Sequence, residues 1–231
     1  MCFPPRCVIC DGVLSGKEQY LCAACTDLPK RIEKNFCFKC GKPVDGEKEY
    51  CDSCKKEEKT FLMGRAAFCY DRVMRRSVLR FKYHGRQEYG EYYAFVLYKM
   101  FGGWIERTGA DALVPVPVHT ERLKKRGYNQ AAVVARELGS RCNIPVYEDL
   151  LLRVKNTLPQ KELSQKERLD NLCKAFSINH SNRVLPDNLN CVIIVDDIYT
   201  TGSTIEACSK VLRSFGVNKV FFLCVCIGYG N

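Results

Sequence analysis

Long apolar runs alternate with amphipathic stretches along the C-terminal part of the chain. Residues 191–197 are apolar until two final acids, and residues 219–227 are apolar almost throughout, as is typical of strands covered on both faces. Between them, residues 203–216 repeat apolar side chains every three or four positions, like the buried face of a helix, and Gly216 marks the end of that helix. A strand, a helix and a strand in this order predict an α/β fold with a mainly parallel sheet.

The chain divides into two parts at a charged stretch. Residues 55–60 combine lysines and glutamates with no apolar side chain, a composition suited to a domain boundary. A length of 231 residues is enough for one domain with a sizeable core and a small appendage. We therefore expect a Cys-rich module over residues 1–60 and an α/β domain over residues 61–231. Within that domain, helical patterns cover residues 75–83, 90–101 and 129–140, and an extended pattern covers residues 111–118.

Composition argues against two broad classes of protein. Hydrophobic residues make up 46% and charged residues 27% of the chain, so wholesale disorder is not expected. The longest apolar run, residues 220–227, is shorter than the ~18 residues that suggest a membrane-spanning helix. The first ten residues lack the apolar core of a secretory signal. We therefore expect a cytoplasmic protein without membrane insertion, whose cysteines stay reduced.

Half of the cysteines form regularly spaced pairs. Eight of the sixteen occur as Cys-x-x-Cys, and all eight lie in the first 54 residues. Two residues between thiolates allow a tight turn to direct both sulfurs at one metal ion, and two such turns complete the tetrahedral shell that Zn²⁺ prefers. The sequence therefore predicts two structural zinc sites. The expected ligands are Cys7, Cys10, Cys22, Cys25, Cys37, Cys40, Cys51 and Cys54.

An internal repeat indicates how the pairs combine. The pairs are separated by eleven residues in "CVICDGVLSGKEQYLCAAC" and by ten in "CFKCGKPVDGEKEYCDSC", and a tyrosine precedes the second pair in both. Closure of each repeat on its own zinc ion fits this spacing better than an interleaved cross-brace, which stays open as the alternative. Disulfides are disfavoured in a reducing compartment, and redox-active pairs are disfavoured because four evenly placed pairs suit structure better than catalysis.

A polar loop follows the apolar strand. The strand ends in Asp196 and Asp197, and the loop leads into the N-terminus of the predicted helix, where free N–H groups favour a phosphate. Gly202 permits a positive φ and a close approach of backbone to ligand. Because acids repel a phosphate, we expect the acid pair to contact ribose hydroxyls and Mg²⁺. The alternative, an acidic turn that caps an ordinary helix, explains neither the second acid nor the glycine. Hydroxyl donors come from Thr200, Thr201, Ser203 and Thr204.

The stretch "VIIVDDIYTTGST" resembles the phosphoribosyl pyrophosphate motif of type I phosphoribosyltransferases. The resemblance implies a Rossmann-like domain with a parallel sheet, in which Asp196 and Asp197 contact the ribose hydroxyls and residues 200–204 hold the 5-phosphate. Tyr199 departs from the family, in which most members have an aliphatic residue there. Thr200 replaces the acid that members acting on 6-oxopurines carry, which argues against such an acceptor.

A second resemblance covers nearly the whole chain. The stretches "YDRVMRRSVLRFKYHG", "PVPVHTERLKKRGYNQA" and "LLRVKNTLPQKELSQKERLDN", together with the cysteine pairs, resemble the ComF family of competence-associated proteins. That family joins an N-terminal zinc-binding module to a phosphoribosyltransferase domain. The resemblance implies a part in natural transformation, namely the handling of single-stranded DNA, with a competence helicase as a further partner. It leaves the acceptor of any phosphoribosyl transfer open.

Cationic side chains are expected to bind the diphosphate. Arg122 and Arg126 follow the predicted extended segment, and a cationic clamp there would stabilise the pyrophosphate that leaves on transfer. A solvated basic turn is the alternative. His119, beside them, is expected to be structural. Lys82 is a further candidate anion contact, unless residues 80–86 merely form the exposed face of a helix.

A segment between apolar stretches has the composition of a lid. Residues 153–171 mix one proline, two glutamines and charges of both signs, which suits a mobile segment that excludes water from the reacting centre. A surface loop without a catalytic role is the alternative. By the family resemblance, the candidate residues in this segment are Arg153, Gln160, Arg168 and Asn171.

The positive charge lies in the larger domain. The chain has a net charge of +10, of which about +1 falls on residues 1–60 and +9 on the remainder. Part of this charge suits a ligand with several phosphates. Residues 80–93 also interleave cations and aromatics, as single-strand binders do, although these aromatics equally suit a helix face turned into the core. Two function classes stay open: an enzyme that transfers a phosphoribosyl group, which the lid and the cationic loop favour, and a binding protein that senses the ligand while holding DNA or a partner.

Overall fold

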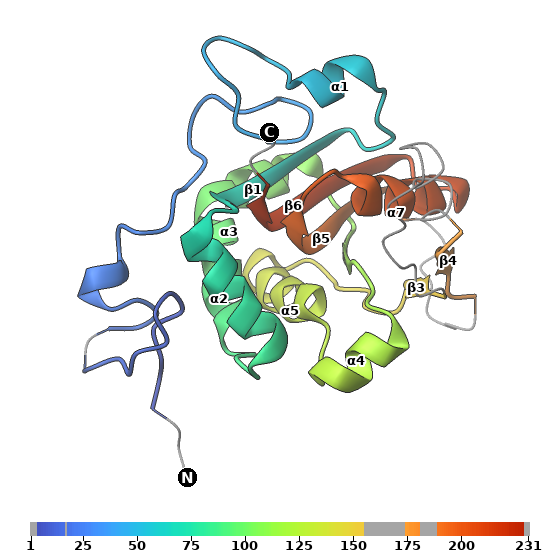
Figure 1. Ribbon diagram of the computed structural model, residues 1–231. Helices are drawn as coiled ribbons and strands as arrows, with labels where there is room; N and C mark the ends of the chain where they lie inside the picture. Colours follow the sequence, from blue (N-terminus) through green and yellow to red (C-terminus); the bar gives the residue numbers. More distant parts are fainter. Residues whose placement is uncertain (1–3, 17, 155–173, 181–188, 229–231) are drawn as a thin grey trace, which may run out of the picture.

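A four-stranded parallel sheet lies at the centre of the molecule (Figure 1), with the strand order β1, β6, β5, β2. The computed structural model describes residues 4–16, 18–154, 174–180 and 189–228. The strands are β1 (Met63–Cys69), β2 (Ala112–Pro115), β5 (Cys191–Tyr199) and β6 (Lys219–Ile227). The two inner strands, β5 and β6, are paired from one end to the other.

Helices cover both faces of the sheet: α2 (Arg72–Tyr83), α3 (Tyr89–Thr108), α5 (Gln130–Cys142) and α7 (Ser203–Ser214). Side chains of a strand alternate between its two faces. Ile193 and Val195 of β5 therefore belong to a core with α2, α3 and α5, whereas Val192 and Ile194 belong to a core with α7. This double coverage explains why β5 is apolar at every position before its acids.

Shorter elements lie around the sheet: a 3-10 turn (Ala23–Cys25), α1 (Asp52–Lys56), α4 (Thr120–Arg126), β3 (Leu151–Arg153) and β4 (Phe176–Ile178). β3 and β4 form a small antiparallel sheet, and β4 contributes apolar residues to the core around α7. α4 follows the carboxyl end of β2, and α7 follows the carboxyl end of β5. Because β2 and β5 are parallel neighbours, both connections lie at the same edge of the sheet. Among the described residues, no helix combines the length and the apolarity needed to cross a membrane.

The predicted α/β fold with a parallel sheet is confirmed, and β6 has the predicted bounds. β5 is two residues longer than predicted, because it stays paired with β6 as far as Tyr199. The acid pair therefore lies inside the strand. The sequence pattern does not predict the elements β1, α1, α4, β3 and β4. β1 contains Gly64 and Arg65, which interrupt its apolar run, and α4 is a short basic helix whose composition resembles that of a surface loop.

The Cys-rich module shares both cores with the α/β domain. Val8, in the first cysteine repeat (residues 7–25), belongs to the core of α2 and α3, and its carbonyl oxygen accepts a hydrogen bond from Ser77 at 2.6 Å. The second cysteine repeat (residues 37–54) contributes Cys37 and Cys40 to the core around α7. Between the repeats, Ile32 donates its N–H to the carbonyl of Ala67 at 2.9 Å. The segment around Ile32 thus covers the outer edge of β1.

Asp11 fastens the first repeat to the helices. Its φ of 68° lies in the left-handed region, which aspartate and asparagine tolerate better than most residues. Its carboxylate accepts a hydrogen bond from Tyr89 Oη at 2.6 Å and pairs with Arg86 Nε at 2.8 Å. Burial alone would raise the pKa of Asp11, but the hydrogen bonds from Tyr89 and Arg86 outweigh it and hold that pKa below its usual value.

Replacing Asp11 with asparagine is expected to lower the free energy of unfolding by about 1–2 kcal/mol near neutral pH, because charge-assisted hydrogen bonds are lost while the backbone conformation is kept. Since the pKa of Asp11 is lowered in the folded state, this stabilisation is present above the ordinary pKa of 3.8 and disappears as the pH falls through the folded value. Urea unfolding at neutral and acidic pH measures both effects. Asp27→Asn, at an exposed site in the same module, is the control; equal losses in the two variants would contradict the role of Asp11.

Candidate ligand site and zinc centres

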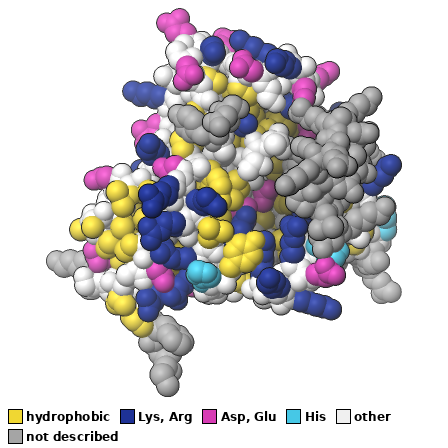
Figure 2. Space-filling model, viewed as in Figure 1, with side chains coloured by type: hydrophobic (Ala, Val, Ile, Leu, Met, Phe, Trp, Pro, Cys, Tyr) yellow, Lys and Arg dark blue, Asp and Glu magenta, His cyan; other side chains and the backbone are white. Residues whose placement is uncertain are grey.

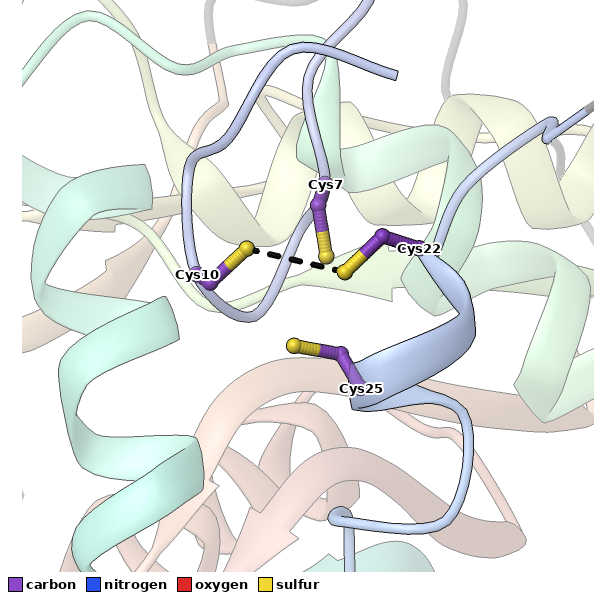
Figure 3. Close-up of side chains that lie close together, drawn as sticks. All are labelled: Cys7, Cys10, Cys22 and Cys25. Atoms are coloured by element: carbon purple, nitrogen blue, oxygen red, sulfur yellow. Dashed lines mark hydrogen bonds between the residues drawn. The ribbon is translucent and has the colours of Figure 1, made fainter. Parts of the chain in front are cut away.

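The eight paired cysteines form two groups of four. Within each group all four sulfur atoms lie within 4.8 Å of one another. Cys10 Sγ and Cys22 Sγ are 3.8 Å apart (Figure 3), and Cys40 Sγ and Cys51 Sγ are 3.6 Å apart. A tetrahedral zinc ion with Zn–S bonds of ~2.3 Å requires sulfurs ~3.8 Å apart, so both groups fit structural zinc. The groups are Cys7, Cys10, Cys22 and Cys25, and Cys37, Cys40, Cys51 and Cys54. Sequential pairing is thus confirmed, and the interleaved alternative is wrong.

Corresponding backbone hydrogen bonds build the two zinc turns. The N–H of Asp11 donates to the carbonyl of Cys7 at 2.8 Å, and the N–H of Gly41 donates to the carbonyl of Cys37 at 2.8 Å. Asp11 and Gly41 both have a positive φ, of 68° and 76°. The sequence repeat is therefore also a structural repeat. In both copies, the residue that follows the first Cys-x-x-Cys pair reverses the direction of the chain.

The acid pair lies at the carboxyl end of β5, where a lysine from another element meets it. Lys82, near the end of α2, donates to Asp197 Oδ1 at 2.8 Å. Asp196 Oδ1 accepts the N–H of Asp197 at 2.8 Å. Burial and the neighbouring Asp197 raise the pKa of Asp196 to about 7. Burial alone would lower the pKa of Lys82, but the charge of Asp197 outweighs burial and raises this pKa above its usual value. Lys82 therefore partners an acid in this structure, and no sequence signal connects two residues so far apart in the chain.

The predicted phosphate loop, residues 200–204, leads from the end of β5 into the first turn of α7. Gly202 precedes the helix with a φ of 83° and has no side chain to cap it. The N–H groups of a first helical turn have no intrahelical partners, so those of α7 can donate to an anion. Thr201 Oγ1 and Ser203 Oγ lie 2.9 Å apart and satisfy each other. Thr200 and Thr201 are exposed.

Three predicted arginines lie on two short elements, and one of them, Arg153, interacts electrostatically with Asp196. Arg122 and Arg126 belong to α4, and Arg153 ends β3. Burial lowers the pKa of Arg153, and the positive charge of Arg122 lowers it further, while Asp196 raises it. Arg126 donates to Tyr83 Oη at 2.8 Å and lies over the ring of Tyr83. The predicted cationic loop is thus the short helix α4.

Other predicted residues have different outcomes. His119 accepts the N–H of Glu121 at 3.3 Å and caps α4, which agrees with the expected structural role. Gln160, Arg168 and Asn171 lie outside the described residues, as does most of the predicted lid.

The structure decides between the two interpretations of residues 80–93. The cations of this segment do not interleave with a row of exposed rings, because four of its five Phe and Tyr side chains are buried and Arg86 pairs with Asp11. Tyr83 alone among them is largely exposed. The buried aromatics are Phe81, Tyr89, Tyr92 and Tyr93. Apart from Tyr83, this segment therefore offers no exposed Phe or Tyr ring on which a base could stack.

Metal analysis of the purified protein is expected to return two zinc ions per chain. Cys25→Ser and Cys54→Ser should each leave one ion, because each removes a ligand from a different cluster. Inductively coupled plasma mass spectrometry with protein quantification provides the measurement, and Cys142→Ser, outside both clusters, should retain two ions. One ion or none in the unaltered protein would contradict two independent sites.

Comparison with known proteins places these features in a family. Residues 1–55 match the family model of a double zinc ribbon domain. Over 223 residues, 93% of each chain, the protein is 32% identical to Competence protein F of Haemophilus influenzae. It is 26% identical to Competence protein ComFC of Bacillus subtilis over 230 residues, covering 91% of this chain and 89% of that one. It is 25% identical to DNA utilization protein YhgH of Escherichia coli K12 over 226 residues, covering 96% and 97%. The extent of these matches shows that the chain belongs to the ComF family of competence proteins.

Proposed function

We propose that the protein binds phosphoribosyl pyrophosphate at the carboxyl end of β5, as type I phosphoribosyltransferases do, and that it acts in the handling of single-stranded DNA during natural transformation. One observation carries the ligand proposal: the acid pair, the phosphate loop and the first turn of α7 meet at one edge of the sheet. Open parallel sheets bind ligands at this edge. The names of the relatives, which refer to competence and DNA utilization, support the second part of the proposal.

The phosphate loop suits the 5-phosphate of the ligand. Its oxygens would accept hydrogen bonds from the first-turn N–H groups of α7 and from Thr201 and Ser203, whose hydroxyls need only rotate away from each other. The ribose hydroxyls would donate to Asp196 and Asp197. Lys82 offsets the charge of the acid pair, so that two carboxylates can lie beside an anionic ligand.

The acid pair also suits a hard divalent cation. Carboxylate oxygens are ligands that Mg²⁺ accepts in proteins, usually together with substrate phosphates. Asp196, with a pKa of about 7, would ionise more completely when positive charge arrives. When bound, Mg²⁺ would neutralise part of the diphosphate charge.

The arginines suit the leaving group of a transfer reaction. An acceptor would form a bond to the anomeric carbon of the ribose while the bond from that carbon to the diphosphate oxygen breaks, and the electron pair would leave with pyrophosphate. Arg122, Arg126 and Arg153 would stabilise its growing charge. Release of pyrophosphate in the presence of candidate acceptors separates this enzyme from a protein that only senses the ligand.

Replacing Asp196 and Asp197 together with asparagine is expected to weaken phosphoribosyl pyrophosphate binding by roughly 100-fold or more, because each charged hydrogen bond is worth ~1.5–3 kcal/mol. Affinity for the unaltered protein should rise between about pH 6 and pH 8, since the Asp196 carboxyl loses its proton near pH 7. Titration calorimetry with Mg²⁺ provides the measurement. Asp45→Asn, at an exposed site, is the control; equal affinity in the double variant and the control would contradict the site.

An exposed stripe on α2 is the candidate DNA surface. The α2 stripe consists of Arg72, Arg75, Arg76, Leu79 and Tyr83, which are all exposed. Figure 2 shows Lys and Arg side chains gathered in a column over α2. Cations with intervening apolar and aromatic side chains suit the backbone and bases of a single strand. The stripe ends at Tyr83, which contacts Arg126 of α4, so a strand bound there would pass beside the ligand site. A competence helicase is a further proposed partner in this role.

Replacing Arg72, Arg75 and Arg76 with glutamine is expected to weaken binding of a labelled single-stranded oligonucleotide at low salt. The slope of log affinity against log salt should decrease by about 2, because each phosphate contact contributes ~0.7. Affinity for phosphoribosyl pyrophosphate should not change. Fluorescence anisotropy over a salt series measures the slope.

A matched variant controls for loss of charge alone. It changes the same number of exposed cations in the Cys-rich module: Lys48, Lys55 and Lys56 to glutamine. If both triple variants lose the same affinity, or if the unaltered protein does not bind at low salt, then the α2 stripe is not the DNA surface.

A further inference from the structure

We propose that the second zinc cluster, formed by the second cysteine repeat, positions the phosphate loop. Two sets of contacts lead from residues beside that cluster to the two ends of the loop, where Tyr199 precedes it and Glu206 follows it. Tyr199 and Glu206 are therefore positioning residues for the loop. The part of this inference that concerns the ligand rests on the proposed function; the part that concerns the loop does not.

The first set of contacts begins at the zinc turn. Gly41, next to Cys40, lies so close to β1 that a Cβ on it would come within 2.9 Å of the carbonyl oxygen of Gly64. The N–H of Gly64 also donates to the carbonyl of Lys39 at 2.8 Å. On the other side, a Cβ on Gly64 would lie 2.0 Å from the ring of Phe222. Two glycines thus allow the zinc turn, β1 and this ring to pack with no intervening space.

The same set continues from Phe222 to the phosphate loop. The rings of Phe222 and Tyr199 are stacked, with centroids 4.8 Å apart and an interplanar angle of 1°. Lys42, in the zinc turn, places its Nζ 6.0 Å from the centroid of the Tyr199 ring. The hydroxyl of Tyr199 reaches Gly202, where a Cβ would lie only 2.2 Å from it. The position of Gly202 is therefore fixed by a ring that the second repeat holds in place.

The second set of contacts begins after α1, the helix that contains Cys54. Thr60 donates its N–H to the Glu206 carboxylate at 3.0 and 3.2 Å, and its hydroxyl donates to Oε1 at 2.6 Å. Glu206 lies in the first turn of α7 and is only 4% exposed. A buried carboxylate is stable only when such donors surround it. The segment that follows the zinc cluster thus supplies hydrogen-bond donors to the buried carboxylate at the start of α7.

The first zinc cluster differs in this respect. Its repeat contacts α2 and α3, through Val8, Ile9 and Asp11. Within the described part of the chain, no hydrogen bond, ion pair or ring contact joins residues 4–29 to residues 199–206. The two clusters have the same ligands, but only the second is connected to the phosphate loop.

Zinc occupancy of the second cluster should therefore set the order of the loop. Without the metal, neither the turn at Gly41 nor the segment from Cys51 to Thr60 has a fixed position. Both sets of contacts are then weakened together. Coupling between two binding sites is reciprocal, so a ligand held by the loop should also slow the loss of zinc from the second cluster.

Hydrogen exchange of the full-length protein tests the positioning without any ligand. Mass spectrometry would follow peptides covering residues 198–207 in the unaltered protein and in the Cys54→Ser and Cys25→Ser variants. We expect exchange in these peptides to be roughly tenfold faster in Cys54→Ser, the factor expected for the loss of one charge-assisted hydrogen bond, and unchanged in Cys25→Ser. Equal exchange in the two variants would overturn the proposal.

Variants that keep all eight ligands cover the case in which Cys54→Ser does not fold. Thr60→Val removes the hydroxyl donor to Glu206, and Tyr199→Ala removes the ring between Phe222 and Gly202. Both should accelerate exchange in residues 198–207, whereas Tyr199→Phe, which keeps the stacked ring, should restore most of the protection. If Thr60→Val and Tyr199→Ala exchange like the unaltered protein, the contacts do not position the loop.

Zinc release to a chromogenic chelator tests the reciprocal effect. Phosphoribosyl pyrophosphate with Mg²⁺ should slow the release of one of the two zinc ions, and Tyr199→Ala should abolish this protection. If calorimetry shows binding but neither ion is retained longer, the coupling is overturned while the proposed function stands. If the ligand does not bind, the proposed function fails, and hydrogen exchange still decides whether the second cluster positions the loop.

Discussion

The arrangement of this protein depends on covering both apolar faces of a four-stranded sheet. Helices alone do not complete either face. The first cysteine repeat adds Val8, Ile9 and Leu14 to the core on one side, and the second repeat adds Cys37 and Cys40 to the core on the other. A segment of this length buries too little surface to be stable by itself, so metal coordination supplies its internal order while the sheet supplies its apolar contacts. The two parts of the chain complete each other.

The features that sequence predicts well are those whose determinants are local. Ligand spacing within each cysteine repeat fixes the pairing of sulfurs, and the strand, acid pair and loop of residues 191–204 are continuous in the chain. The features that sequence does not predict arise from distant partners. Lys82 meets Asp197, and Thr60 meets Glu206, only because the sheet order brings α2 and the end of the module to β5 and α7. Likewise, the aromatic pattern of residues 80–93 cannot show which helix face is buried until the packing of α3 on β1 is known.

Helix α2 illustrates how closely these tasks are combined. Its inner face holds the first repeat through Ser77, its last turn presents Lys82 to the acid pair, and its outer face carries exposed arginines such as Arg75. Because a helix is rigid over this length, a displacement of the module would move Lys82 as well. Substitutions on the inner face, in the last turn and on the outer face of α2 should therefore be tested separately.

The residue after the first cysteine pair of each repeat has a further consequence. At this left-handed position one copy has Asp11, whose side chain reaches Arg86 and Tyr89, and the other has Gly41, whose missing side chain lets β1 approach. The first repeat binds the helices through the carboxylate of Asp11. The second repeat packs closely on β1 because Gly41 has no side chain. An alignment of the two copies would treat these residues as equivalent, yet neither would serve in the other place. The two repeats are thus alike in their cysteine ligands but not interchangeable in the fold.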